Sequence, residues 1–95
     1  MSRYKLSGDF ARTALEKAER SFEAGHPGIA ISQSNLALVL HDLGQLEEAR
    51  DLLRKALASF EAKFESTHPS VITVRGNLEV VLLALKQRAS SVQGT

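Results

Sequence analysis

The chain has 95 residues, which is the size of one small domain. It contains no cysteine, and this excludes thiol catalysis and cysteine-ligated zinc. Twelve basic and 11 acidic residues leave a formal net charge of +1, whereas a dedicated nucleic-acid-binding domain carries a basic excess. We therefore expect no nucleic-acid partner.

Hydrophobic residues make up 43% of the chain, which is enough for a folded core. Valine and isoleucine together number only nine, so strands have little to be built from and we expect an all-α fold. The longest apolar run covers residues 80–85 and is far shorter than the about 20 residues that span a bilayer. No targeting pattern is visible in the first residues. We expect a soluble, cytoplasmic protein without a membrane partner.

Two helices are predicted in the first half of the chain, over residues 3–24 and 28–43. In the second of them, apolar residues recur at spacings of three to five, which is a helical pattern. These residues are Ile31, Leu36, Val39, Leu40 and Leu43. Pro27 suits the first turn because its missing N–H group needs no partner there. Gly44 favours the left-handed conformation that ends a helix.

Two further helices are predicted over residues 46–64 and 69–87. The first of them has an apolar stripe and a charged opposite face, which is typical of an amphipathic surface helix. Ser66 or Thr67 in the connector is the expected N-cap of the last helix. Residues 89–95 show no periodicity, so we expect a flexible tail after a single helical domain over residues 1–88.

The chain repeats itself with a period of 42 residues. This shift aligns 15 identical pairs, among them His26-Pro27 with His68-Pro69 and Asn35-Leu36 with Asn77-Leu78. Each period holds two helices joined by short connections, so neighbouring helices run antiparallel. The predicted fold is a right-handed αα-hairpin solenoid of four antiparallel helices.

The two kinds of helix differ in charge. Residues 28–40 contain no charged side chain, and a helix without a charged face is covered on more than one side. The helices over 28–43 and 69–87 are therefore the expected inner ones. The helices over 3–24 and 46–64 are the expected outer, solvated ones.

One stretch combines small and large residues at a spacing known from a protein family. Its residues are Asn35-Leu36-Ala37, Leu40, Gly44, Leu46, Ala49, Leu52 and Ala56-Leu57. The pattern resembles the tetratricopeptide repeat, and the 42-residue period resembles the longer repeats of the kinesin light chain type. The resemblance covers residues 3–87 and implies a module that binds a protein or peptide partner. Small side chains such as Ala37 and Ala49 are expected where two helices cross closely.

In this family, the inner helices line a concave groove that holds a peptide or a helix of another protein. The resemblance places in that groove Ser34, Asn35, Leu38, His41, Asp42, Thr73, Asn77 and Val80, together with Ile31, Gly76 and Leu83. The two asparagine amides can donate to and accept from a peptide backbone. Alternatively, both amides hydrogen-bond neighbouring helices. The groove is mainly apolar and favours a hydrophobic partner segment.

The helix over residues 69–87 carries more apolar side chains than one neighbouring helix can cover. Either the chain is part of a longer repeat array, or two copies associate through this helix. In the second case Val80, Val81 and Leu83 lie at the contact of a homodimer. The alternative function is therefore a structural or oligomerisation element.

The histidines do not indicate a metal or catalytic site. His26 and His68 lie on corresponding turns without a carboxylate pair, which favours connector residues over metal ligands. His41 and Asp42 are adjacent on a helix and therefore point about 100° apart. The chain has no nucleophile motif and no glycine-rich phosphate loop. We expect no enzyme activity, no metal and no cofactor.

Overall fold

A computed structural model describes the backbone of residues 3–93 and the side chains of residues 8–90. Four helices follow one another: α1 (Arg3–Ser21), α2 (Pro27–Asp42), α3 (Leu46–Lys63) and α4 (Pro69–Gln93). No strand occurs in this part of the chain, and the predicted all-α fold of four helices is confirmed. None of the four helices is both long enough and apolar enough to cross a membrane.

The helix boundaries differ from the prediction mainly at two ends. α1 ends at Ser21 rather than at residue 24, and α4 continues to Gln93 rather than ending at residue 87. The sequence offers no stop signal in α4, because Lys86 stands where Gly44 ends α2 one repeat earlier. Residues 94–95 lie outside the described part, and the flexibility expected for residues 89–95 stays a prediction.

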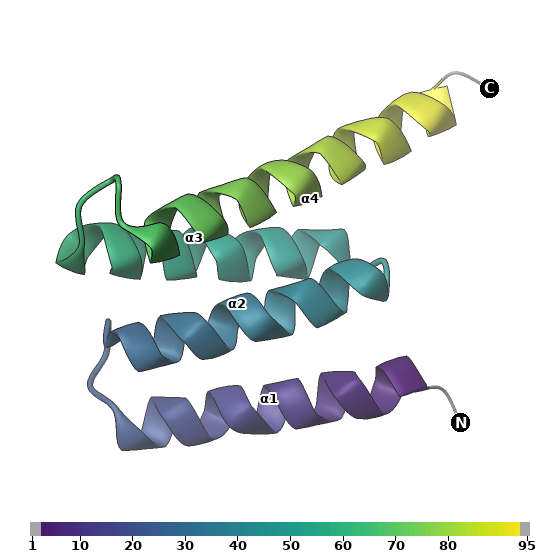
Figure 1. Cartoon of the computed structure of the whole chain (residues 1–95). Helices are drawn as coiled ribbons and strands as arrows, with labels where there is room; N and C mark the ends of the chain where they lie inside the picture. The colour runs from purple at the N-terminus through teal and green to yellow at the C-terminus, as the bar shows by residue number, and fades with distance from the viewer. Residues whose placement is uncertain (1–2, 94–95) are drawn as a thin grey trace.

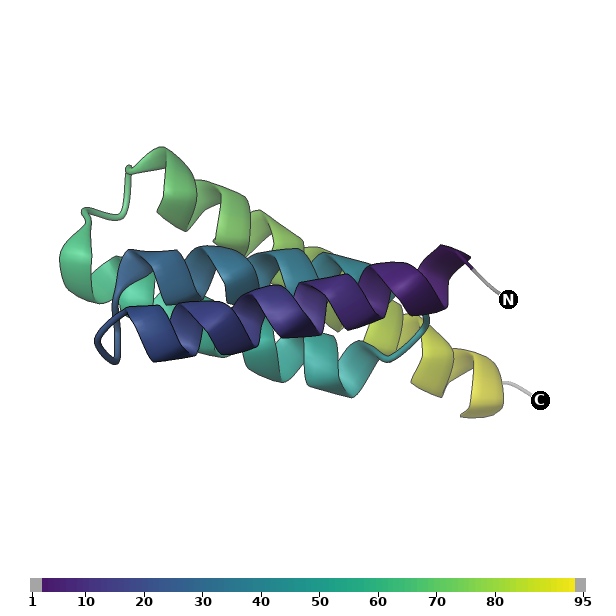
Figure 2. The same cartoon turned by 90° about the horizontal axis from the view of Figure 1, so that it is seen from below.

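Consecutive helices run antiparallel and pack side by side (Figure 1). α2 packs between α1 and α3, α3 also packs on α4, and α2 meets α4 over a short length. Seen from below, α4 crosses the stack obliquely: its first turns lie on the side of α2 and its last turns on the side of α3 (Figure 2). α2 and the first half of α4 therefore share one face of the molecule, which we call the inner face.

The core lies between α2, α3 and α4. Ala37, Ala49 and Ala56 are fully buried, in agreement with the close packing predicted for small residues. Leu36, Leu40, Leu53 and Val71 are the largest side chains that are completely enclosed. A side chain larger than alanine at the three small positions would separate the helix axes.

The turn between α2 and α3 depends on Gly44, which has a φ angle of +81° as expected. The Gly44 amide donates to the carbonyl of His41, and the Gln45 amide donates to the carbonyl of Leu40. These two bonds satisfy carbonyl groups that the end of α2 would otherwise leave without partners.

The two His-Pro connectors are built alike. His26 caps α2, because its Nδ1 accepts a hydrogen bond from the Gly28 amide at 2.8 Å. His68 does the same for α4, with the Ser70 amide at 3.1 Å. Each imidazole also stacks on the phenylalanine four residues earlier, with ring centroids 4.2 and 4.0 Å apart. The prediction of Ser66 or Thr67 as the cap of α4 is therefore wrong, since the histidine ring supplies the acceptor.

Candidate functional site

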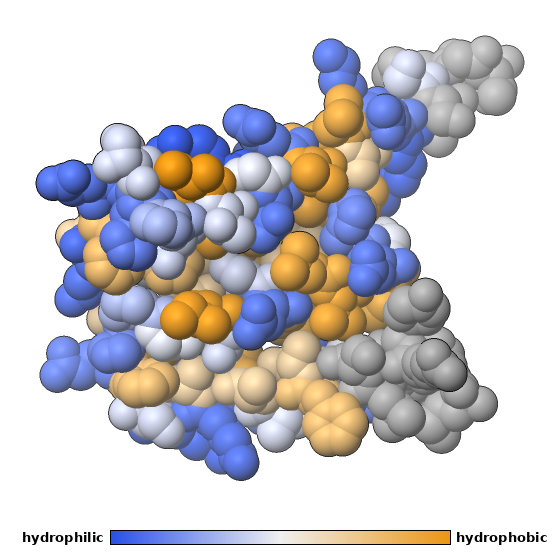
Figure 3. All heavy atoms as spheres, viewed as in Figure 1, coloured by the Kyte–Doolittle hydropathy of each residue, from blue (hydrophilic) through white to orange (hydrophobic). Residues whose placement is uncertain are grey.

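The inner face carries large apolar side chains that the fold leaves exposed. Ile31 and Leu38 on α2 expose 53% and 45% of their surface, and Val80 and Leu83 on α4 expose 54% and 55%. Hydrophobic atoms gather in separate groups over α2 and α4 on this face, among hydrophilic ones (Figure 3). Exposed apolar surface of this kind is typical of a site that binds another molecule.

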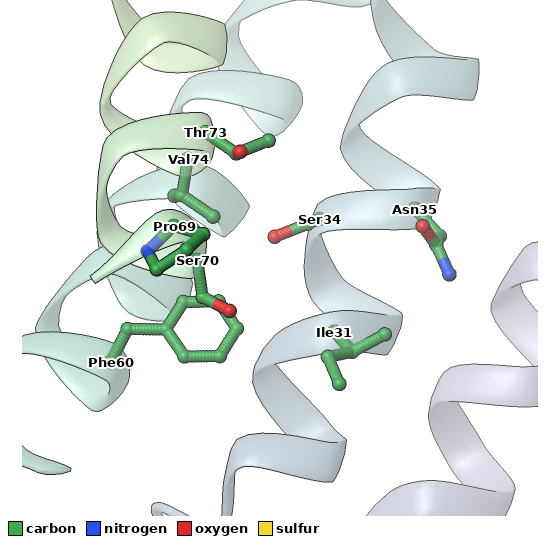
Figure 4. A pocket seen from close by; sticks show the side chains of 8 residues that line it. All are labelled: Ile31, Ser34, Asn35, Phe60, Pro69, Ser70, Thr73 and Val74. Atoms are coloured by element: carbon green, nitrogen blue, oxygen red, sulfur yellow. The ribbon is translucent and has the colours of Figure 1, made fainter. Parts of the chain in front are cut away.

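A hollow of about 230 Å³ lies on the inner face between α2 and α4. Its lining residues are Ile31, Ser34 and Asn35 from α2, Pro69, Ser70, Thr73 and Val74 from α4, and Phe60 from α3. The lining combines apolar walls with three hydroxyl groups and contains no charged side chain (Figure 4). Such a surface suits an apolar side chain whose neighbouring backbone needs hydrogen-bond partners.

Ser34 occupies the middle of the α2 wall. Its side chain is directed toward α4, whereas the amide of Asn35 is directed away from α4 (Figure 4). The Ser34 hydroxyl is enclosed and has no hydrogen-bond partner among the described residues. A buried hydroxyl without a partner costs about 1–3 kcal/mol.

The structure brings only part of the predicted groove set to the hollow. Ser34, Asn35 and Thr73 line it. Leu38 and Val80 are exposed on α2 and α4 outside the lining set, and Asn77 is half-buried. His41 and Asp42 lie at the C-terminal end of α2, where His41 Nδ1 is 3.7 Å from Asp42 Oδ1.

The two asparagines do not support the structural alternative. Asn35 is exposed, and among the described residues neither Asn35 nor Asn77 forms a side-chain hydrogen bond to a neighbouring helix. Of the two, only Asn35 borders the hollow.

The prediction that Val81 lies at the contact between two copies is wrong. Val81 was expected at a surface between two copies, but it is only 2% exposed and belongs to the core. Residues 80–85 form one apolar run, and adjacent helical positions point to different sides, so the run alone does not tell the covered side from the open one. Within that run Val80 and Leu83 are the exposed residues, together with Leu82 at 39%.

The predicted groove set does not contain several of the lining residues. Phe60 comes from an outer helix, whereas all predicted groove residues lie on the inner helices. Pro69, Ser70 and Val74 belong to the first turns of α4, next to the predicted Thr73. A helical spacing of three and four residues from Thr73 is the signal that could have indicated Pro69 and Ser70.

No residue that lines the hollow takes part in an ion pair with the described residues. Arg12 on α1 binds both carboxylate oxygens of Glu48 on α3, at 2.8 and 3.0 Å. A hydrogen bond from Arg12 lowers the pKa of Glu48. A hydrogen bond from Arg88 lowers the pKa of Glu47. No group of three potential metal ligands occurs within the described residues.

Comparison with known families gives one finding. A family model described as tetratricopeptide repeat matches residues 1–62 and again residues 28–93. The two matches overlap and together cover nearly the whole chain. A comparison with curated proteins gives no significant match.

Proposed function

The chain belongs to the tetratricopeptide repeat family, and from this premise we propose that its inner face binds an apolar segment of a partner protein. Repeats of this family generally mediate protein–protein interaction. The hollow between α2 and α4, with its apolar walls and three hydroxyl groups, carries the proposal.

The size of the hollow indicates what enters it. About 230 Å³ is less than the roughly 300–1,000 Å³ of typical small-molecule pockets. We propose that it takes one aliphatic or aromatic side chain of the partner, against Ile31, Phe60 and Val74. Burial of apolar surface contributes roughly 25 cal/mol per Å², so one enclosed side chain supplies about 1.5–3 kcal/mol.

The exposed residues around the hollow extend the contact. Leu38 and Val80 would cover apolar parts of the segment beyond the hollow, toward the C-terminal ends of α2 and α4. Asn35 and Asn77 would hydrogen-bond its backbone. His41 and Asp42 would contact the partner segment at the C-terminal end of α2.

The hollow has no charged lining residue, so it offers no basic group that would bind an acidic peptide. The 42-residue period resembles kinesin light chain repeats, which read acidic peptides through basic groove residues. Here the end of α2 carries Asp42, and no lining residue is basic. We propose an uncharged, apolar segment as the ligand, in the cytoplasmic setting expected from the sequence, and no catalytic role.

A selection from a random peptide display library on the immobilised chain tests the proposal. We expect enriched peptides to share an apolar anchor residue and few charges. The L38E variant should bind those peptides at least tenfold more weakly, whereas F10E, a matched change of an exposed residue on α1, should bind them unchanged. Enrichment of acidic peptides, or equal binding by L38E and the wild type, would contradict the proposal.

A further inference from the structure

One row of side chains on α4 is left uncovered by the other three helices. Ile72, Gly76, Val80 and Leu83 follow one another at spacings of four, four and three residues, which places them on one face of the helix. The three large residues of this set are each more than half exposed. We call these four residues the Gly76 row.

Gly76 has no explanation within the monomer. It lies in the interior of α4, where glycine is less favourable than any residue except proline. A Cβ atom built on Gly76 meets nothing within 4 Å, so no described neighbour requires its small size. A missing side chain in the middle of an apolar row allows the backbone of a second helix to approach closely.

Two opposite charges flank the row on one side. Arg75 and Glu79 are four residues apart, and both project beside the Gly76 row on the same flank. Arg75 Nη2 lies 3.5 Å from Glu61 Oε2, a long contact that leaves other guanidinium N–H groups available. Glu79 takes part in no ion pair with the described residues.

We propose that two copies of the chain associate through antiparallel packing of α4 on α4, with the two-fold axis beside residue 77. Residues on the same flank face each other in an antiparallel helix pair. Arg75 of each copy then meets Glu79 of the other copy, and Gly76 lies at the crossing point. A parallel pair would not bring this flank against itself, so the charges select the antiparallel arrangement.

The apolar side chains fit the same axis. Ile72 comes to lie opposite the segment between Val80 and Leu83 of the second copy, so each large residue of the row finds an apolar partner. The contact is self-complementary and closes as a dimer. A formal net charge of +1 gives little repulsion between the copies.

The expected dimer is weak. A single helix face is at the low end of interface sizes, below about 1,200 Å² in total. We therefore expect a dissociation constant in the micromolar range. This inference does not depend on the proposed groove function, although the two surfaces overlap: Val80 and Leu83 lie on the inner face, and Gly76 belongs to the expected groove.

Sedimentation velocity of the intact chain, from micromolar to millimolar concentration, tests the dimer. The wild type should change from monomer to dimer over this range. L83D should raise the dissociation constant at least tenfold, because it places a carboxylate in the apolar contact. F10D makes the same change at a residue on α1 that is 74% exposed, and it should leave the association unchanged.

A charge exchange tests the antiparallel geometry. R75E and E79R should each weaken the dimer, because each places like charges opposite one another, and the double variant R75E/E79R should restore it. Circular dichroism checks that each variant keeps its helices. A wild type that stays monomeric at millimolar concentration would overturn the proposal. So would a dimer unaffected by L83D, or one that the double variant does not restore.

Discussion

Arg12 and Glu48 form a two-pronged ion pair between α1 and α3, two helices whose backbones make no direct contact. Both helices pack on α2, and the Arg12–Glu48 ion pair links α1 directly to α3. The two residues are 36 positions apart in the chain, and both are almost half exposed. Bidentate geometry makes this pair more specific than an ordinary surface contact.

The Arg12–Glu48 pair makes stability depend on pH. Its hydrogen bond lowers the pKa of Glu48 in the folded state below the value of about 4.3 in an unfolded chain. At pH values between the folded-state and unfolded-state pKa of Glu48, the unfolded state binds more protons than the folded state. The stabilisation is therefore present above about pH 4.3 and is lost as the pH falls through the folded-state pKa. Solvent screening limits the contribution to roughly 0.2–1 kcal/mol.

Thermal melts of E48Q and the wild type measure this effect. The Tm difference at pH 7 should shrink as the pH falls below about 4.3 toward the folded-state pKa of Glu48, because protonation removes the charged partner of Arg12. Glu16 is an exposed glutamate on α1 without an ion pair among the described residues, so E16Q should show no such pH-dependent difference. A constant E48Q difference from pH 3 to pH 7 would rule out the ion pair as its cause.

Leu40 and Leu38 lie two residues apart on α2 and provide a matched pair for the core. Leu40 is 1% exposed, so L40A should lower the free energy of unfolding by about 2–5 kcal/mol. Leu38 is 45% exposed, and L38A should cost less than about 1 kcal/mol. Urea unfolding measures both values. Equal losses would show that the assigned faces of α2 are wrong.

The His68 cap predicts a specific order of variants. H68A removes both the acceptor for the Ser70 amide and the ring that stacks on Phe64, and it should cost about 1–2 kcal/mol. H68N keeps a capping acceptor but loses the stacking, so its stability should lie between H68A and the wild type. Urea unfolding checks the order, and an H68N as unstable as H68A would assign the effect to stacking alone.

Two glycines should respond to alanine with opposite signs. G44A should destabilise the chain by about 1 kcal/mol or more, because the residue has a φ angle of +81°. G76A should stabilise the dilute monomer by up to about 1 kcal/mol, because the helix interior there has open space. Thermal melts at low micromolar concentration compare the two, and a destabilising G76A would indicate a local role for Gly76.

The repeat made the architecture predictable from the sequence. His26-Pro27 and His68-Pro69 placed the starts of two equivalent helices, and the glycine at position 44 placed the turn between the helices of one period. The end of α4 was not predictable in the same way, because Lys86 neither stops nor caps a helix. The histidine caps were also missed, since serine and threonine are the usual acceptors at that position.

The candidate site was predictable only in part. The resemblance to the tetratricopeptide repeat placed Ser34 and Thr73 in the groove, and both line the hollow. Phe60 was out of reach, since its place in the hollow depends on how deeply α3 packs behind the two inner helices. The prediction for Val81 was wrong because the rotation of α4 about its own axis, relative to α3, decides which residues of the apolar run are buried.

Amide chemical shifts of the ¹⁵N-labelled chain, followed during titration with a selected peptide, test the central claim most directly. Binding on the inner face predicts that the largest shift changes fall on Ile31, Ser34, Leu38 and Thr73, with small changes at Phe10 and Lys55 on the outer helices. The largest changes on α1 and the exposed side of α3, with the inner-face amides unmoved, would contradict it.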